Sequence, residues 1–391
     1  MTRSQTFVWR CGHMFCLFLI PIASIMEHEL INILDQFCIS GAISTYGCGH
    51  INESYLVNDT PKYILQKINT AVFKQPEKVM ENIVAVTEHL REKIRKVGGN
   101  PDRETLNLIK AKDGKSFYKC DGNNYYRLYQ YIEGTVALEA ANTPEQFYYA
   151  ARAFGKFQRL LSDFPVCRLH ETIPDFHNTP LRLEALLAAV NEDRCGRAKD
   201  VADEIAFVYA RCADTAVVID AINKGRVLLR VTHNDTKLNN VLLDACTMEG
   251  VCVIDLDTVM PGSMLYDYGD ALRYGANTAS EDETDLSKVR FDLTLYESFT
   301  RGFLEELLPD LTECEIGLMP FSVKLLTLEC GIRFLTDYLN GDTYFKIHRK
   351  NHNLDRARTQ LRLVADIEQK LDEMKEITEK TTYALMIQKE V

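Results

Sequence analysis

The sequence lacks several patterns that mark common classes of protein. Its 12 cysteines form no C-x-x-C pair, so neither a zinc site nor a thioredoxin-like motif is indicated. We interpret them as reduced, mostly buried thiols of a cytoplasmic protein. No run of Lys and Arg has the length of a nucleic-acid-binding segment, and the net charge is −11. We therefore expect no nucleic acid among the partners.

The apolar run near the N-terminus is too short to span a bilayer. It covers residues 14–26, is interrupted by Pro21 and resembles a short signal segment. We favour an over-extended start, with translation beginning at Met26, where an ordinary helix pattern begins. We expect residues 1–25 to be a disordered extension or a mis-assigned start, and we expect no membrane partner.

What the chain does contain is ordinary for a globular protein. It has 391 residues, of which 46% are hydrophobic and 26% charged, and it shows no internal repeat or low-complexity tract. This length suggests two lobes, each with its own core. Apolar spacing predicts helices over residues 27–38, 76–96, 286–308 and 320–339, a strand over 63–68, and a surface helix over 354–380.

The strongest functional pattern is HNDTKLNNVLLDACTMEGVCVIDLD, residues 233–257. Two short apolar runs flank a loop, which is the pattern of an antiparallel hairpin. In such a hairpin Asn240 and Asp255 lie at the same end, and Asp235 lies in the polar loop that leads there. A carboxylate able to accept a proton is thus predicted close to an amide oxygen and a second carboxylate. Hard oxygen ligands of this kind suit Mg²⁺.

This grouping resembles the catalytic loop and metal aspartate of protein-kinase-like enzymes. Together with VIDLDTVMPGSMLYDYGDALR, it resembles the aminoglycoside phosphotransferase and choline kinase superfamily. Within that superfamily it is most similar to the N-acetylhexosamine 1-kinases, small-sugar kinases of the bacterial cytoplasm. The resemblance implies ATP and Mg²⁺ as cofactors and a small sugar as the phosphoryl acceptor.

The resemblance also implies an α+β, protein-kinase-like fold with two lobes. A small N-lobe, mostly antiparallel sheet, is expected over residues 26–133 and binds the nucleotide. A larger helical C-lobe is expected over residues 134–391 and carries the catalytic and acceptor-binding residues. We expect a monomer, with a dimer as the alternative.

Two glycines mark the expected nucleotide loop. Gly47 and Gly49 lie near the middle of two strand-like runs, where a hairpin backbone can close on phosphates. The surrounding residues are similar to the G-x-G-H-I-N-x-x-Y run of the sugar kinases. That similarity implies that Gly47, Gly49 and His50 contact the nucleotide. In the same family, the end of the aromatic run 125–134 is the hinge, which places the backbone of Tyr131 and Ile132 at the adenine edge.

The strand over residues 63–68 departs from the protein-kinase pattern. Aligning Y-I-L with the apolar residues before the strand lysine places Gln66, not a lysine, at the phosphate-pairing position. Lys67 follows it, on the opposite face of a regular strand. Both residues are candidates for contact with the α- and β-phosphates. Glu81 and Glu88 are candidates for the carboxylate that pairs with that cation.

The resemblance assigns roles to the residues of the hairpin. Asp235 is expected to be the general base, while Asn240 and Asp255 hold Mg²⁺. His233 is expected to be a buried hydrogen-bonding brace. Asp257 is a candidate for a supporting or structural role.

Three further positions follow from the same resemblance. Asp267, in Y-D-Y-G-D, is similar to the family's aspartate that braces the catalytic loop. On the acceptor side, an Arg and a Tyr hydroxyl are good partners for sugar hydroxyls and an acetamido carbonyl. Arg333 and Tyr344 are the candidates, and Tyr274 is a candidate for stacking on a pyranose ring. Without the family likeness, a surface salt bridge for Arg333 and a core position for Tyr274 are the simpler interpretations.

These observations predict a kinase that transfers the γ-phosphoryl group of ATP to the anomeric hydroxyl of GlcNAc or GalNAc. Another small-molecule kinase of the superfamily, acting on homoserine, choline or an aminoglycoside, is the nearest alternative. A catalytically silent nucleotide-binding module is the other alternative, and Gln66 is the feature in its favour.

Overall fold

A computed structural model describes residues 5–8, 17–20, 22–47 and 51–390. Its contacts separate the chain into two compact units. The first unit comprises Met1–Val84 and Leu106–Glu133, and the second comprises Ala85–Thr105 and Gly134–Val391. The sequence places residues 85–105 in the N-lobe, whereas here they group with the second unit. Their side chains explain this grouping, because His89 lies 3.0 Å from Asp163 of the second unit.

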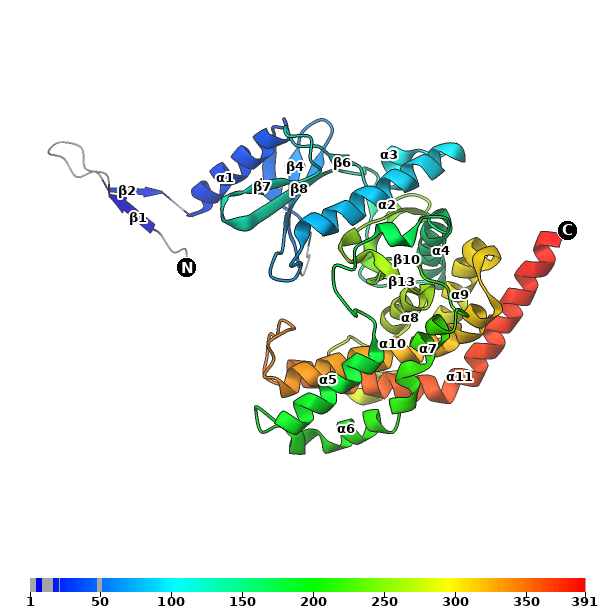
Figure 1. Cartoon of the computed structure of the whole chain (residues 1–391). Helices are drawn as coiled ribbons and strands as arrows, with labels where there is room; N and C mark the ends of the chain where they lie inside the picture. Colours follow the sequence, from blue (N-terminus) through cyan, green and yellow to red (C-terminus); the bar gives the residue numbers. More distant parts are fainter. Residues whose placement is uncertain (1–4, 9–16, 21, 48–50, 391) are drawn as a thin grey trace. The chain divides into compact units, whose positions relative to one another are not determined.

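The first unit contains an antiparallel sheet whose described strands run in the order β3-β4-β5-β8-β6, with β7 also paired to β8 (Figure 1). The predicted strand over 63–68 is confirmed as β5. The bounds are β3 Ala42–Thr45, β4 Glu53–Asn58, β5 Tyr63–Ile68, β6 Leu108–Ile109, β7 Tyr118–Cys120 and β8 Asn124–Gln130. The mostly antiparallel sheet expected for the smaller lobe is therefore confirmed.

The two faces of this sheet have different partners. Side chains of α1 (Ile22–Gln36) form an apolar core with the face that carries Tyr55, Leu65 and Leu128. Because successive side chains of a strand alternate, Ser54, Gln66 and Arg127 lie on the other face. On that face the buried guanidinium of Arg127 contacts the sulfur of Met80 in α2 (Pro76–Lys96) at 3.9 Å. The sheet is therefore covered by a helix on each face.

The described parts of the N-terminal extension have regular structure. β1 (Gln5–Val8) pairs antiparallel with β2 (Leu17–Ile20), and α1 begins at Ile22 rather than at residue 27. The expectation that residues 1–25 are a disordered extension or a mis-assigned start stays a prediction. Residues 1–4, 9–16 and 21 lie outside the described part of the chain.

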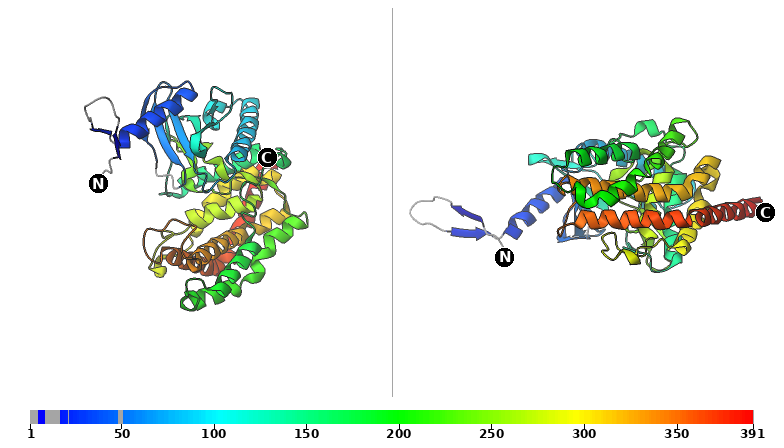
Figure 2. Two further views of the ribbon diagram at one scale, coloured as in Figure 1. Left: turned by 60° about the vertical axis from the view of Figure 1, so that its left-hand side comes forward. Right: turned by 90° about the horizontal axis from the view of Figure 1, so that it is seen from below.

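The second unit is mostly helical, and its helices pack around α10 and around the pair formed by α4 and α9 (Figures 1 and 2). The bounds are α3 Pro101–Glu104, α4 Pro144–Leu160, α5 Thr179–Glu192, α6 Ala202–Tyr209, α7 Val217–Asn223, α8 Met264–Gly275, α9 Leu293–Leu307, α10 Glu313–Leu339 and α11 His352–Glu390.

Capping residues set two helix starts that differ from the predicted ones. α9 begins at Leu293 rather than at residue 286, because the Asp292 carboxylate accepts hydrogen bonds from the N–H groups of the first turn. α10 begins at Glu313 rather than at residue 320. There Thr312 and Glu315 form a capping box, in which each side chain bonds to the other residue's backbone N–H.

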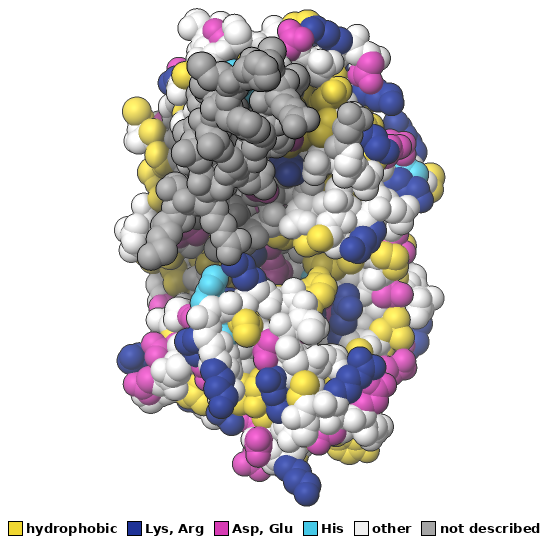
Figure 3. Space-filling model, turned by 90° about the vertical axis from the view of Figure 1, so that its left-hand side faces the viewer, with side chains coloured by type: hydrophobic (Ala, Val, Ile, Leu, Met, Phe, Trp, Pro, Cys, Tyr) yellow, Lys and Arg dark blue, Asp and Glu magenta, His cyan; other side chains and the backbone are white. Residues whose placement is uncertain are grey.

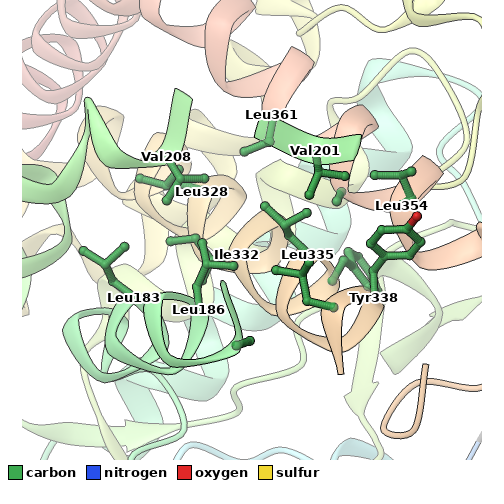
Figure 4. Close-up of a cluster of buried hydrophobic side chains, with 14 of the residues drawn as sticks. Leu183, Leu186, Val201, Val208, Leu328, Ile332, Leu335, Tyr338, Leu354 and Leu361 are labelled. Carbon is green, nitrogen blue, oxygen red and sulfur yellow. The ribbon is translucent and has the colours of Figure 1, made fainter. Parts of the chain in front are cut away.

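The C-terminal helix is a core element, and the predicted surface helix is wrong in this respect. Leu363, Val364 and Ile367 of α11 are fully buried, and α11 runs beside α10 in both views of Figure 2. Figure 4 shows Leu354 and Leu361 of α11 among the buried side chains of α5, α6 and α10. The sequence period shows one apolar stripe, but it does not show that α10 and α9 cover it.

The hairpin predicted to carry the catalytic residues lies in the second unit. β11 (Val241–Asp244) pairs antiparallel with β12 (Gly250–Val253), as predicted, and β9 (Thr135–Val136) pairs with the outer edge of β11. A second short antiparallel pair joins β10 (Arg230–Thr232) to β13 (Met260–Gly262). The loop that contains Asp235 runs from β10 to β11. Both ends of that loop are therefore held by strands.

Among the described residues, no helix is both long enough and apolar enough to cross a membrane. On the face shown in Figure 3, Lys and Arg side chains are interspersed with Asp and Glu rather than gathered into one basic area. The absence of nucleic-acid and membrane partners remains a prediction.

Close approach of α4 and α9 generates a stability prediction. A Cβ at Gly302 of α9 would overlap the backbone oxygen of Tyr148 in α4. Alanine favours a helix over glycine by about 1 kcal/mol, but overpacking costs about 1–3 kcal/mol, so Gly302→Ala should destabilise the protein. We expect Tm to fall by several degrees in calorimetry, since 1 kcal/mol corresponds to about 2–4 °C in a domain of this size class.

Gly317 of α10 provides the matched control, because a Cβ there meets no atom within 4 Å. Gly317→Ala should keep or raise Tm, since only the helix propensity changes. An equal response of the two variants would show that α4 and α9 can separate without loss.

Candidate active site

Asp235 lies in the loop between β10 and the hairpin, with its carboxylate held from two sides. One oxygen is 3.0 Å from Nζ of Lys237, and the other is 3.3 Å from Nδ2 of Asn240. The same Nδ2 donates a hydrogen bond of 2.8 Å to the backbone oxygen of Asp235. The predicted base and the first predicted metal ligand are thus in direct contact.

The hairpin register brings Asp255 to the same end as Asn240. The N–H of Ile254 donates to the backbone oxygen of Asn240 at 2.9 Å, so Asp255 is one residue beyond the facing position. Asp255 has φ 59° and ψ 57°, a left-handed conformation that is uncommon for residues other than glycine. This conformation ends the strand at its exposed tip, and such outliers occur most often at functional sites.

The donor set at this end fits a hard cation. Because Nδ2 of Asn240 is used by Asp235, the remaining amide atom, Oδ1, is an acceptor available to a cation. The exposed Asp255 contributes a carboxylate from the adjacent position. One amide oxygen and one carboxylate, completed by water and phosphate oxygens, match the ligand preference of Mg²⁺.

His233 is buried and braces the loop. Its Nε2 lies 2.8 Å from the backbone oxygen of Ile254, which can only accept, so Nε2 carries the proton. Its Nδ1 accepts from the N–H of Asp235 at 3.3 Å. One neutral imidazole therefore ties the loop to the hairpin, and both ring nitrogens are already engaged.

Asp267, the first acidic residue of α8, holds the loop from within the core. Its carboxylate accepts the N–H groups of His233 and Asn234 at 2.9 and 2.7 Å, and it also accepts from the side-chain amide of Gln158. Its backbone oxygen accepts the hydroxyl of Thr236 at 2.6 Å. Burial raises the pKa of Asp267, and the three N–H donors act in the opposite direction.

Asp257 is buried in the short helical turn after Asp255, so it does not share an exposed face with that residue. The next residue, Thr258, donates from its hydroxyl to the backbone oxygen of His233 at 2.6 Å. Asn234, also left-handed with φ 64°, donates to the backbone oxygen of Thr258 at 2.8 Å. This turn therefore supports the catalytic loop from the side of the second strand.

The sequence did not predict that Lys237 lies beside Asp235, the expected base. The Asp235 carboxylate raises the pKa of Lys237, as does Asp270 to a lesser degree, and burial of the amine acts against them. Asp270 also accepts the N–H of Thr236 at 3.2 Å and pairs with Arg273 at 2.8 Å. The result is a chain of alternating charges that begins at Asp235. The signal was present in the motif N-D-T-K, but lysines are usually solvated.

The acceptor candidates divide into two neighbourhoods. The guanidinium of Arg333 lies 5.3 and 5.5 Å from the ring centroids of Phe176 and Phe345. Tyr344, next to Phe345, is 67% exposed, and its N–H donates to Asp337 at 2.8 Å. Arg333 is thus held between aromatic rings rather than in a surface salt bridge.

Tyr274 lies in the last turn of α8, and the charged groups near it are those of Glu281, Lys237, Glu139 and Arg273. Burial raises its pKa, and the nearby carboxylate of Glu281 adds to this effect. Glu281 pairs with Arg273 at 3.0 Å, which places Tyr274 beside the charged chain that starts at Asp235.

In the first unit, Gly47 of the expected nucleotide loop lines a small cavity. Gly47 has φ +74°, which glycine adopts without strain, and Tyr46 before it meets Tyr131 edge to face with centroids 6.0 Å apart. The loop and the hinge strand are therefore in contact. The backbone N–H of Tyr131 donates to the backbone oxygen of Lys62 at 2.9 Å, so this N–H already has a partner. Ile132 is buried. Gly49 and His50 lie outside the described residues.

Gln66 and Lys67 lie on opposite faces of the sheet, and which of them contacts the phosphates stays a prediction. Gln66 shares a face with Arg127, and its Oε1 accepts from Nε and Nη2 of that arginine at 3.0 and 2.9 Å. Lys67 lies on the α1 face, with its amine 6.0 Å from the ring centroid of Tyr126. Of the helix glutamates, Glu81 and Glu88 both have exposed side chains on α2.

Comparison with known proteins shows the family of this chain. A family model described as the phosphotransferase enzyme family (APH) matches residues 43–306, more than half of the chain. The chain belongs to the phosphotransferase enzyme family. The matched region begins at β3 and includes the nucleotide loop, the catalytic loop and the hairpin.

Solved structures of kinases and phosphotransferases share the fold. A microcompartment-associated aminopropanol kinase aligns with TM-score 0.55 and 15% identity, covering 89% of this chain and 98% of that one. The amicoumacin kinase hAmiN, in complex with AMP-PNP, Ca²⁺ and Ami, gives 0.56 and 12%, covering 88% and 93%. Spectinomycin phosphotransferase APH(9)-Ia, in complex with ADP and spectinomycin, gives 0.56 and 13%, covering 88% and 98%.

The central position of Asp267 in this phosphotransferase generates a prediction. Asp267→Asn keeps the shape but replaces one accepting oxygen by an NH₂ donor, so at least one of the three donors loses its acceptor. An unsatisfied buried group costs about 1–3 kcal/mol, and we expect a lower Tm together with reduced turnover. Thermal unfolding and steady-state kinetics measure the two effects.

The control is Asp292→Asn, the same substitution at the N-cap of α9. Asparagine caps a helix as well as aspartate does, so Tm should change little. If Asp267→Asn behaved like this control, the loop would not depend on the carboxylate.

Proposed function

We propose that this phosphotransferase is an ATP-dependent kinase of small sugars. It transfers the γ-phosphoryl group to the anomeric hydroxyl of an N-acetylhexosamine, GlcNAc or GalNAc, and forms the 1-phosphate. The observation that carries the proposal is the contact of Asp235 with Asn240, with Asp255 at the same end of the hairpin. Similarity of the surrounding motifs to the N-acetylhexosamine 1-kinases supports the choice of acceptor.

Asp235 acts as the general base. Its carboxylate accepts the proton of the acceptor hydroxyl and orients that oxygen toward the phosphorus. An anomeric hydroxyl is more acidic than other sugar hydroxyls, so an ordinary aspartate suffices. Lys237, 3.0 Å away, offers a positive charge near the transferred group.

Asn240 and Asp255 hold Mg²⁺, which neutralises charge on the nucleotide phosphates when it is bound. His233 and Asp267 keep the loop in place through the backbone N–H groups of residues 233–235. In phosphoryl transfer most of the rate enhancement comes from positioning and electrostatics, so a rigid loop is a direct contribution to catalysis.

The first unit supplies the nucleotide site. Gly47 lets the loop approach the phosphates, and the backbone near Tyr131 and Ile132 meets the adenine. Because the N–H of Tyr131 donates to the backbone oxygen of Lys62, the backbone carbonyl of Tyr131 is the group left to bind the adenine. Two structural neighbours with adenine nucleotides in their descriptions, AMP-PNP and ADP, support ATP as the donor.

On the acceptor side, Arg333 binds the sugar or its acetamido oxygen. Its position between Phe176 and Phe345 limits its rotamers, so less conformational entropy is lost on binding. Tyr344 offers a second hydroxyl, and Tyr274 is a stacking residue near Asp235. A guanidinium in this place disfavours the cationic acceptors choline and aminoglycosides. We further propose a cytoplasmic monomer.

An acceptor screen tests the proposal. Purified protein is incubated with ATP, Mg²⁺ and one acceptor at a time: GlcNAc, GalNAc, homoserine, choline, an amino alcohol or an aminoglycoside. We expect ADP release with an N-acetylhexosamine and a 1-phosphate product by NMR. Asp235→Asn should abolish the release and keep ATP affinity, whereas Asp372→Asn, on the exposed face of α11, should change neither. Turnover with another acceptor alone would reject the sugar assignment.

Arg333 provides the sharper test of the acceptor site. A charge-assisted hydrogen bond is worth about 1.5–3 kcal/mol, which corresponds to roughly a tenfold to hundredfold loss of kcat/KM for the sugar in Arg333→Ala. Arg333→Lys should recover little, because an ammonium lacks the planar fork. Steady-state kinetics at saturating ATP measure the effect.

Arg301 serves as the matched control, since its guanidinium lies 4.6 Å from the ring centroid of Tyr148 on a different part of the unit. Arg301→Ala should leave the acceptor KM unchanged. Unchanged acceptor kinetics in both Arg333 variants would make Arg333 a structural residue.

A further inference from the structure

Three polar side chains cross the sheet of the first unit in register. Ser54 on β4 faces Gln66 on β5, and Gln66 faces Arg127 on β8. Arg127 donates to Oε1 of Gln66 through Nε at 3.0 Å and Nη2 at 2.9 Å. Gln66 in turn donates from Nε2 to Oγ of Ser54 at 3.0 Å. The three side chains form one continuous hydrogen-bonded row.

The direction of this row is determined by its members. A guanidinium can only donate, so Gln66 must present its oxygen to Arg127 and its NH₂ group to Ser54. The hydroxyl of Ser54 accepts from Gln66, and its own proton therefore points elsewhere. Each bond of such a row polarises the next, so the positive charge of Arg127 strengthens the Ser54 O–H as a donor.

Ser54 lines a cavity of about 220 Å³, together with residues of the loop around Gly47. The other described lining residues are Thr45, Tyr46, Gly47, Asn52, Glu53 and Tyr55. This volume is below the usual range for a whole small-molecule ligand, about 300–1,000 Å³, but it suits part of one, such as a pair of phosphates. The backbone of Ser54 also closes the loop, because its oxygen accepts the N–H of Tyr46 at 2.9 Å.

The alternative cation, Lys67, lies on the other face, with its amine 6.0 Å from the ring centroid of Tyr126. In the β4-β5 register it is directly opposite Glu53, and opposite charges at such a position stabilise a sheet. The carboxylate of Glu53 also accepts the hydroxyl of Tyr55 at 2.8 Å, on the side of the sheet that α1 covers. Lys67 thus has a structural explanation that does not involve the nucleotide.

We propose that the Arg127–Gln66–Ser54 row replaces the strand lysine of related kinases, and that Ser54 donates the hydrogen bond to a phosphate of the nucleotide. Arg127 is 1% exposed, so its charge acts through Gln66 and not by direct contact. The strand position that carries a lysine in related kinases thus carries the neutral Gln66 here, and the cation, Arg127, lies on the neighbouring strand β8. This inference rests on the nucleotide-binding part of the proposed function and is independent of the acceptor.

Calorimetry with ADP and with adenosine tests the inference without any acceptor. Ser54→Ala should weaken ADP binding by roughly tenfold to hundredfold, the value of one hydrogen bond to a charged group, and leave adenosine binding unchanged. Ser54→Thr keeps the hydroxyl in a residue favoured in strands and should retain ADP affinity. Lys67→Met should retain it as well.

A double-mutant cycle separates a relay from two independent contacts. Gln66→Met removes all three hydrogen bonds of the row with a side chain of similar length, and thermal unfolding checks that the variant is folded. If the row acts as one unit, Ser54→Ala should weaken ADP binding much less in the Gln66→Met background than in the wild type. Additive losses would overturn the relay.

Other outcomes are also decisive. Loss of ADP affinity in Lys67→Met with none in Ser54→Ala would assign the phosphate contact to Lys67 and overturn the inference. Equal losses of ADP and adenosine affinity in Ser54→Ala would do the same, because the contact would not be to phosphate. A wild-type protein that binds neither ligand would instead reject the proposed function.

Discussion

The catalytic loop depends on one buried carboxylate. Asp267 receives the backbone N–H groups of His233 and Asn234 and thereby fixes the chain direction immediately before Asp235. A left-handed residue such as Asn234 stays in place only where its surroundings over-determine it. Taking a carboxylate out of water is costly unless its oxygens are satisfied, and here three N–H donors satisfy them. The rest of the site is built on this fixed segment.

From that segment, two sets of bonds lead to the reacting groups. His233 and Thr258 connect the loop to the second strand of the hairpin, which sets the position of Asp255 relative to Asn240. Asp270 binds the loop beyond the base and lies in the charged chain that contains Lys237. A preorganised arrangement of this kind needs little rearrangement when the phosphoryl group moves, which is the main way in which proteins accelerate such reactions.

In both units a cation lies next to a group that accepts from it or carries the opposite charge. In the second unit, Lys237 is placed two residues from the base, where each charge stabilises the other. In the first unit, the strand position of the usual lysine holds Gln66, and the cation lies across the strand pair at Arg127. An arginine is suited to this burial, because its fork presents two N–H groups to a single oxygen and remains charged. The absence of a lysine at position 66 therefore does not by itself indicate a silent site.

The sequence by itself determined the features that depend on neighbouring residues: the antiparallel hairpin, the placement of Asn240 and Asp255 at one end, and β5 with Gln66 and Lys67 on opposite faces. These follow from strand alternation and turn spacing, which are local. Tertiary structure alone decided which partners satisfy the buried polar groups. Gln158 and Asp267 are 109 residues apart, and Gln66 and Arg127 are 61 apart. Tertiary structure also decided that α11 is a core helix. The apolar stripe of one helix does not reveal which other helices cover it. Long-range pairing is chosen by packing and by the cost of unsatisfied buried groups, and neither has a local signature in the chain.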